Sequence, residues 1–127
     1  MMWPEYFPEK CPPENARSEE HEVYRLVNGS TAVASDFLPT VVEAPHRPFP
    51  ADMRCMACGV SVFGDVADAI KTRAKFKALK SKHIAKGTIT PNDGVVLETG
   101  APTHMTWWLK TPTPHANFSE VLPNVAN

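Results

Sequence analysis

The stretch "RCMACGVSVFGD", residues 54–65, joins a cysteine pair, a short apolar run and a helix-start signal. Within the run, two valines alternate with Ser61 and Phe63, which is the period-2 pattern of a strand. Asp65 is a good N-cap, and apolar residues recur after it at helical spacing through "GDVADAIKTRAKF". A strand that leads directly into a helix is therefore expected, with the helix ending near Ala74 or continuing to Leu79.

Four further segments on either side have the character of strands. They are residues 21–28 ("HEVYRLVN"), 82–90 ("KHIAKGTIT"), 95–99 ("VVLET") and 104–110 ("HMTWWLK"). The turn "PNDG" predicts a hairpin between the second and third of these four, and the last three are expected to pair in sequence. The predicted fold class is α+β: a mainly antiparallel twisted sheet of about five strands, with one main helix on one face.

Length and proline content predict how the chain is organised. A chain of 127 residues is of the size of one domain, and 11 of its 13 prolines lie at the two ends and in one middle stretch. We expect a proline-rich N-terminal arm (1–20), an α+β domain (21–111) and a C-terminal tail (112–127). The aromatic residues of the arm favour either an apolar strap against the domain or a loose terminus.

Hydropathy and cysteine number favour a cytoplasmic location. The sequence has no apolar run long enough for a membrane span, and its first residues lack the pattern of a signal peptide. Three cysteines, an odd number, are not typical of a secreted disulfide framework. No membrane partner is expected.

Charge is strongly segregated along the chain. Residues 1–69 carry a net charge of −6, residues 70–90 a net charge of +7 without a single acid, and residues 91–127 a net charge of −2. The expected contact residues of this basic segment are Lys71, Arg73, Lys75, Lys77, Lys80 and Lys82. An acidic protein partner fits this segment better than nucleic acid, because only Phe76 is available among the bases for stacking. A solvated helix face is the simpler alternative.

The strand "HMTWWLK" is the second expected contact surface. Adjacent strand residues face opposite ways, so Trp107 and Trp108 belong to opposite faces of the sheet. One of them is expected to fill the core and the other to cover an edge or meet a partner, together with His104. The alternative is that both are core residues.

The cysteines allow three interpretations. Cys55 and Cys58 have the spacing of half a zinc site, which Cys11 and a histidine, with His104 among the candidates, would complete. A redox pair is less favoured, because the pair precedes a strand instead of opening a helix. The favoured interpretation is that these cysteines pack as small apolar residues at the entry to the strand.

No complete catalytic or nucleotide-binding motif occurs in the sequence. Three strand segments, "VYRLV", "GVSVF" and "VVLET", resemble the arginine, serine and glutamate stations of ADP-ribosyltransferase folds. The resemblance implies an NAD site in which Arg25 holds a phosphate, Ser61 supports the nicotinamide pocket and Glu98 stabilises charge at the ribose. The paired acidic motif usual around that glutamate is missing.

The interpretation that best fits these patterns is a small non-catalytic binding or accessory protein with a protein partner, which uses the basic segment and the aromatic strand. An ADP-ribosyltransferase-like enzyme and a small zinc-stabilised domain remain as alternatives.

Overall fold

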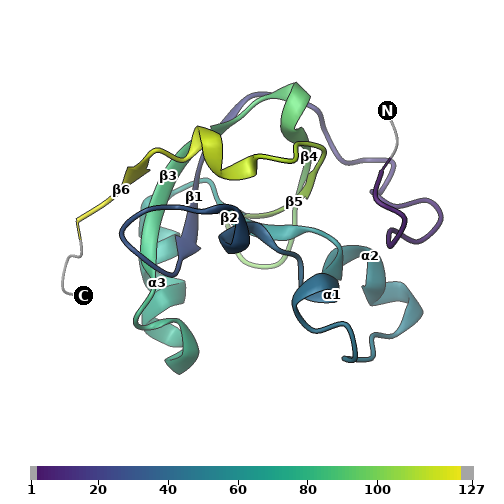
Figure 1. Ribbon diagram of the computed structural model, residues 1–127, viewed down its shortest axis with the longest axis horizontal. Coiled ribbons are helices and arrows are strands. Elements are labelled where there is room, and N and C mark those ends of the chain that lie inside the picture. The colour runs from purple at the N-terminus through teal and green to yellow at the C-terminus, as the bar shows by residue number, and fades with distance from the viewer. Residues whose placement is uncertain (1–2, 124–127) are drawn as a thin grey trace.

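A six-stranded antiparallel sheet forms the centre of the protein in the computed structural model, which describes residues 3–123 (Figure 1). The strands are β1 (His21–Val27), β2 (Val60–Phe63), β3 (His83–Ile89), β4 (Gly94–Glu98), β5 (His104–Leu109) and β6 (Glu120–Val121). Their order across the sheet is β4-β5-β2-β1-β3-β6. The predicted α+β class is confirmed, with β6 as a sixth strand that the sequence pattern did not indicate.

Short helices make up the remaining regular structure. The α-helices are α1 (Thr40–Glu43), α2 (Arg54–Ala57) and α3 (Val66–Lys75). The 3₁₀ helices are η1 (Ala34–Phe37), η2 (Ala51–Met53), η3 (Lys77–Leu79), η4 (Pro91–Asp93) and η5 (Pro114–Asn117). The carboxylate of Asp65 caps α3 as predicted by accepting a hydrogen bond from the Ala67 amide at 2.9 Å.

The expected hairpin between residues 82–90 and 95–99 is wrong. β3 pairs with β1 and β6, whereas β4 pairs with β5 on the far side of the sheet. The link between them forms η4, in which the Asp93 carboxylate accepts hydrogen bonds from the backbone and the hydroxyl of Thr90. Gly94 then takes a φ of 141°, a conformation that favours glycine, and the chain enters β4 instead of turning back along β3.

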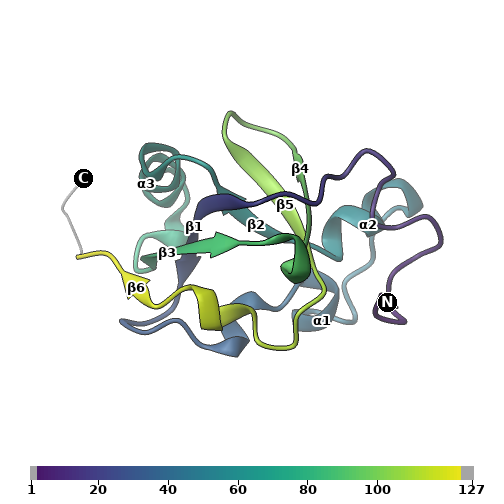
Figure 2. The same cartoon turned by 90° about the horizontal axis from the view of Figure 1, so that it is seen from above.

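The sheet is curled so that its two halves approach each other. The connection from β3 to β4 is only four residues long, so the end of β3 must lie close to the start of β4. Arg17, just ahead of β1, also exchanges two backbone hydrogen bonds with Val96 of β4, at 2.7 and 2.8 Å. Figure 2 shows the chain leading into β1 as it runs beside β4. This curvature gives the sheet two separately covered faces.

The main core lies on the face that η1 and η5 cover. Valines of β1, β2 and β4 pack there against Met105, Trp107, Phe37 and Phe118. Phe118 is 1% exposed, so the predicted tail (112–127) contributes a central core residue.

Two smaller clusters cover the opposite face. One lies under α3 and contains Phe63, Ala69 and Ile84. The other surrounds Trp108 and includes Cys58. The apolar residues of the N-terminal arm that pack in it are Trp3, Phe7, Cys11 and Ala16. The expected main helix on one face is therefore present, and the arm packs as an apolar strap against the Trp108 cluster, at the other end of the molecule from α3 (Figure 1).

A disulfide ties the arm to the domain. Cys11 is bonded to Cys55 at the start of the second α-helix, 44 positions along the chain. The rings of Trp3 and Phe7 stack at 5.5 Å between centroids and pack against the Trp108 cluster. Within residues 3–123, every helix is too short and too polar to cross a bilayer.

Candidate functional site

A groove of about 360 Å³ opens between the α3–η3 segment and the η1–α1 segment, with strands β1, β2 and β5 as its floor. In Figure 1, α3 and α1 both lie below the strands, α3 at the left and α1 at the right. The polar residues that line the groove are Arg25, Thr40, Glu43, Ser61, Thr72, Lys82 and His104. Residues from five separate parts of the sequence therefore meet in this groove.

The groove exists because β1 and β2 separate. Within residues 3–123, the register between these strands consists of one pair, Tyr24 opposite Phe63. Beyond that pair, the guanidinium of Arg25 takes the position of a ladder partner, and its Nη1 donates to the carbonyl oxygen of Ser61 at 2.6 Å. A charged side chain thus satisfies a strand carbonyl where no neighbouring strand does so.

Arg25 is held rigidly. Its Nε and Nη2 donate to the carbonyl oxygen of Asp36 at 2.9 and 2.7 Å, and the guanidinium lies 5.3 Å from the centroid of the Phe37 ring. Desolvation lowers the pKa of Arg25 to about 10, while the carboxylates of Glu43 and Asp36 act in the opposite direction. Arg25 therefore remains a cation at neutral pH.

The nearby carboxylate of Asp36 does not neutralise Arg25 by direct contact. It accepts hydrogen bonds from the backbone amides of Asn28 and Val33 at 3.0 and 2.9 Å, and so fixes the loop after β1. Among residues 3–123, no carboxylate oxygen lies within 4 Å of the Arg25 guanidinium. The floor of the groove consequently holds the Arg25 cation, and Glu43, which also lines the groove, lies near enough to raise the pKa of Arg25.

A serine and a histidine are hydrogen-bonded at the same floor. The Nε2 of His104 lies 2.9 Å from the Oγ of Ser61, and its Nδ1 lies 2.6 Å from the carbonyl oxygen of Thr99. A carbonyl only accepts, so Nδ1 carries the proton, and in the neutral ring Nε2 accepts the proton of the Ser61 hydroxyl. The ring of Phe63, 5.4 Å away, packs edge to face against the imidazole.

Sheet register explains this pair. Ser61 of β2 stands opposite Thr106 of β5, and His104 stands opposite Phe63. Ser61 and His104 are thus diagonal neighbours on one face of the sheet. Motif searches miss such a pair, because the two residues are 43 positions apart and only the strand pairing brings them together. The sequence patterns predict His104 as a contact residue and as a candidate zinc ligand, but not its pairing with Ser61.

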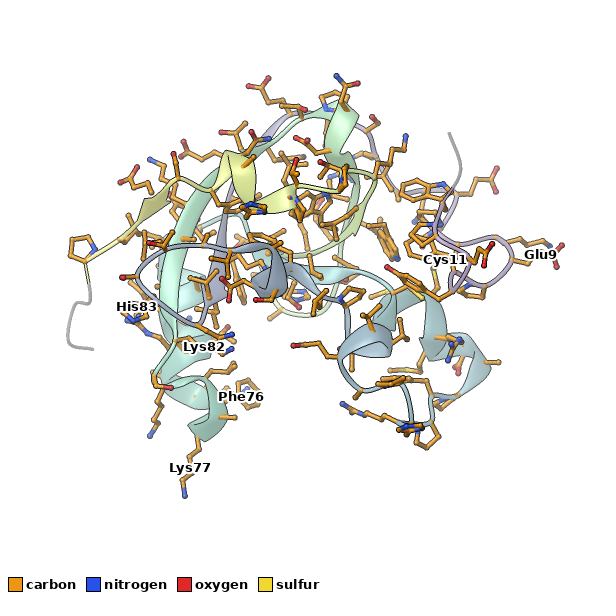
Figure 3. All side chains as sticks on the ribbon, in the orientation of Figure 1. Glu9, Cys11, Phe76, Lys77, Lys82 and His83 are labelled. Carbon is orange, nitrogen blue, oxygen red and sulfur yellow. A yellow bond between two sulfur atoms is a disulfide. The ribbon has the colours of Figure 1, made fainter. Side chains whose placement is uncertain are left out.

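The basic segment forms one wall of the groove and projects beyond it. Lys71, Lys75, Lys77 and Lys80 are exposed, and Phe76 is 49% exposed between them. Figure 3 shows Phe76 and Lys77 at the far end of this wall. No carboxylate of residues 3–123 lies within 4 Å of these four ammonium groups.

Two other members of the basic segment are placed differently. Arg73, predicted as a contact residue, is only 5% exposed, and its Nη1 donates to the carbonyl oxygen of Lys82 at 3.3 Å. It stabilises the segment from inside and is not free to meet a partner. Lys82 is half-buried, lines the groove and donates from Nζ to the side-chain oxygen of Asn28.

The expected aromatic contact surface is not present. Trp107 and Trp108 do face opposite ways, but both are buried, at 1% and 0% exposed. Their indole nitrogens donate to the carbonyl oxygens of Asp93 and Cys55, so both rings are satisfied within the fold. The curled sheet is covered on both faces, and a tryptophan on either face becomes a core residue. Of this strand's candidates, His104 alone reaches the groove.

The zinc set of Cys11, Cys55, Cys58 and His104 does not come together. Cys11 and Cys55 form the disulfide, and the imidazole of His104 is engaged by Ser61 and Thr99. Cys58 is a buried thiol whose pKa is raised by desolvation. Over residues 3–123, no group of three or more histidine, cysteine or acidic side chains is arranged to hold a metal ion.

The residues implied by the resemblance to ADP-ribosyltransferases converge in part. Arg25 and Ser61 meet in the groove, but Glu98 does not line it. The Glu98 carboxylate pairs with Arg17 at 3.1 Å, with its side chain 70% exposed. The acid of the groove is Glu43, which the sequence patterns did not single out. No protein-family model, curated protein or solved structure matches the chain.

Proposed function

We propose that the protein is a binding protein that holds an acidic segment of a protein partner. The contact surface is the basic arm, which we define as the exposed side chains Lys71, Lys75, Phe76, Lys77 and Lys80 together with Lys82 at the groove. The observation that carries the proposal is that four exposed ammonium groups and one exposed aromatic ring share a single projecting element, without an acidic partner among residues 3–123.

The charge distribution supports an acidic partner. Like charges on one short element repel each other, and a complementary surface relieves this repulsion while it steers the encounter. The floor of the groove beside the arm adds the cation of Arg25. An acidic segment that lies along the basic arm would therefore meet the lysines of the groove wall and Arg25 of the groove floor.

Phe76 supports a protein in preference to a nucleic acid. An exposed aromatic ring surrounded by charged residues is typical of a contact that dominates a protein interface. Lys75 places its Nζ 5.5 Å from the Phe76 centroid, which keeps the ring beside the charge. Outside residues 70–90 the chain is acidic, with net charges of −6 over residues 1–69 and −2 over residues 91–127, and would repel an extended polyanion.

Fluorescence anisotropy with two probes of equal net charge tests the proposal. The first is a labelled peptide of alternating glutamates and leucines, and the second is a labelled single-stranded RNA. We expect the peptide to bind more tightly at 150 mM salt, and Phe76→Ala to weaken its binding by about tenfold, the size of a moderate hot spot. The double variant Lys75→Glu, Lys77→Glu is expected to abolish binding.

Lys110→Glu is the matched control, because this lysine lies on another surface, with its Nζ 5.2 Å from the Trp3 ring centroid. Its peptide binding should equal that of the wild type. Tighter binding of the RNA, or equal peptide binding by the charge-reversed double variant, would overturn the proposal.

A further inference from the structure

We propose that Ser61 is a nucleophile activated by His104, and that the floor of the groove is an acyl-transfer site for a small ester. The inference does not depend on the partner proposed above, because it rests on the Ser61–His104 pair and concerns a small molecule. Arg25 is the residue that both proposals use. Three relationships carry it: the hydrogen-bonded serine and histidine, the carbonyl that orients the histidine, and the cation beside the serine.

The serine, the histidine and the carbonyl form the arrangement that nucleophilic catalysis requires. The distance from Ser61 Oγ to His104 Nε2, 2.9 Å, lies within the range for proton transfer to a general base. The bond from Nδ1 to the Thr99 carbonyl fixes the tautomer in which Nε2 is the acceptor. Thr99 is itself positioned by a 2.8 Å hydrogen bond between its hydroxyl and that of the buried Thr106.

The nucleophile is open to a substrate. Ser61 is exposed although it lies within a strand, because β1 diverges from β2 at this point. Its side chain lines a groove of about 360 Å³, at the small end of the range for small-molecule sites. Three leucines line the same groove and suit a short apolar acyl chain. They are Leu26 of β1, Leu38 after η1 and Leu79 of η3.

Arg25 supplies positive charge where an oxyanion would form. A guanidinium has five N–H groups, and three of them are used in the bonds to the carbonyls of Asp36 and Ser61. The other two N–H groups are not used in these three bonds, and we assign them to the substrate oxygen. Because the guanidinium is fixed before the substrate arrives, it needs no reorganisation during the reaction.

The proposed reaction is hydrolysis of the ester through an acyl-serine intermediate. Ser61 Oγ attacks the ester carbonyl carbon, its proton passes to His104 Nε2, and the carbonyl electrons move onto the oxygen beside Arg25. The C–O bond to the alkoxy group then breaks, and the alcohol leaves with the proton from His104. Water, activated by His104 in the same way, attacks the acyl-serine and releases a carboxylic acid, which restores the Ser61 hydroxyl.

A fluorophosphonate probe tests the nucleophile directly. Ser61 Oγ would form a bond to phosphorus while fluoride leaves, and mass spectrometry of a digest would locate the added mass. We expect labelling at Ser61 in the wild type, none at this position in Ser61→Ala, and a rate at least tenfold lower in His104→Gln. Ser81→Ala is the matched control, because Ser81 is equally exposed but lies outside the groove.

Tryptophan fluorescence establishes that each variant is folded, since both buried indoles report on the cores. Should His104→Gln fail to fold, Ser61→Cys in a Cys58→Ala background provides a second measurement. Its thiol at position 61 should react with iodoacetamide faster than an ordinary exposed thiol, because His104 would draw off the proton. Absence of label on Ser61, equal labelling in folded His104→Gln, or an ordinary thiol rate would each overturn the proposal.

Discussion

The Nε2 atom of His104 lies 2.9 Å from the Oγ atom of Ser61, and both side chains face a groove whose floor also holds the cation of Arg25. This juxtaposition results from two properties of the sheet. The register of β2 with β5 makes the serine and the histidine diagonal neighbours, and the divergence of β1 from β2 leaves Ser61 exposed and His104 half-buried at the groove. The groove thus combines a basic wall suited to an acidic segment with a polar floor suited to a small molecule.

Replacement of Arg25 by methionine should destabilise the fold. The substitution removes the donors that satisfy the carbonyl oxygens of Ser61 and of the buried Asp36, and a buried carbonyl left without a partner costs about 1–3 kcal/mol. Urea unfolding monitored by tryptophan fluorescence would measure the loss. Arg47→Met is the matched control, because Arg47 is exposed, and its free energy of unfolding should stay within about 0.5 kcal/mol of the wild type. Equal effects of the two substitutions would show that Arg25 does not hold the strands at the groove.

Alanine at position 87 should loosen the contact between β3 and the C-terminal segment. An added Cβ would lie 2.5 Å from the carbonyl oxygen of Asn117 and from the ring of Phe118, and neither can move without disturbing the main core. We expect a loss of about 1–3 kcal/mol in thermal or urea unfolding. At Gly29 an added Cβ meets nothing within 4 Å, so Gly29→Ala should leave stability unchanged or slightly raised. A neutral Gly87→Ala would contradict the close packing of this segment.

The local patterns of the sequence predicted five strands and the capped helix, because alternation and capping act over a few residues. They could not predict β6, which is two residues long. They also could not predict that β4, after "PNDG", pairs with β5 and not with β3, because this pairing depends on the curl of the whole sheet. The same limit applies to the site. Arg25, Ser61 and His104 were each candidates, but their convergence and the role of Thr99 follow from strand register, and the burial of both tryptophans follows from the covering of both faces.

Removal of the disulfide should destabilise the protein strongly. The double substitution Cys11→Ala, Cys55→Ala opens a loop closed over 44 positions, and the chain-entropy model gives a loss on the order of 4 kcal/mol. Urea unfolding of the variant, and of the wild type with and without a thiol reductant, would measure it. The reductant should shift the midpoint of the wild type but leave that of the double variant unchanged. If the reductant leaves the unfolding midpoint of the wild type unchanged, the N-terminal arm is held by apolar packing alone.

The thiol of Cys58 should make stability sensitive to alkaline pH. Burial raises its pKa above the ordinary value of 9.0, with Arg54 acting weakly in the opposite direction. As the pH rises past 9.0, the unfolded chain loses this proton while the folded protein keeps it, so the unfolded state is favoured. The contribution of the neutral thiol is complete below pH 9.0 and is lost as the pH rises toward the folded-state pKa.

Comparison with Cys58→Ala isolates this effect from the lysines and tyrosines that titrate in the same range. We expect the free energy of unfolding of the wild type to fall more steeply between pH 8 and pH 10 than that of the variant, in urea titrations with the disulfide verified by mass spectrometry. Parallel pH profiles for the two proteins would mean that the thiol is solvated in the folded state. In that case Cys58 would also react readily with iodoacetamide at pH 8 in the folded protein. Its exposure of 1% instead predicts a slow reaction in the folded protein and a fast one in urea.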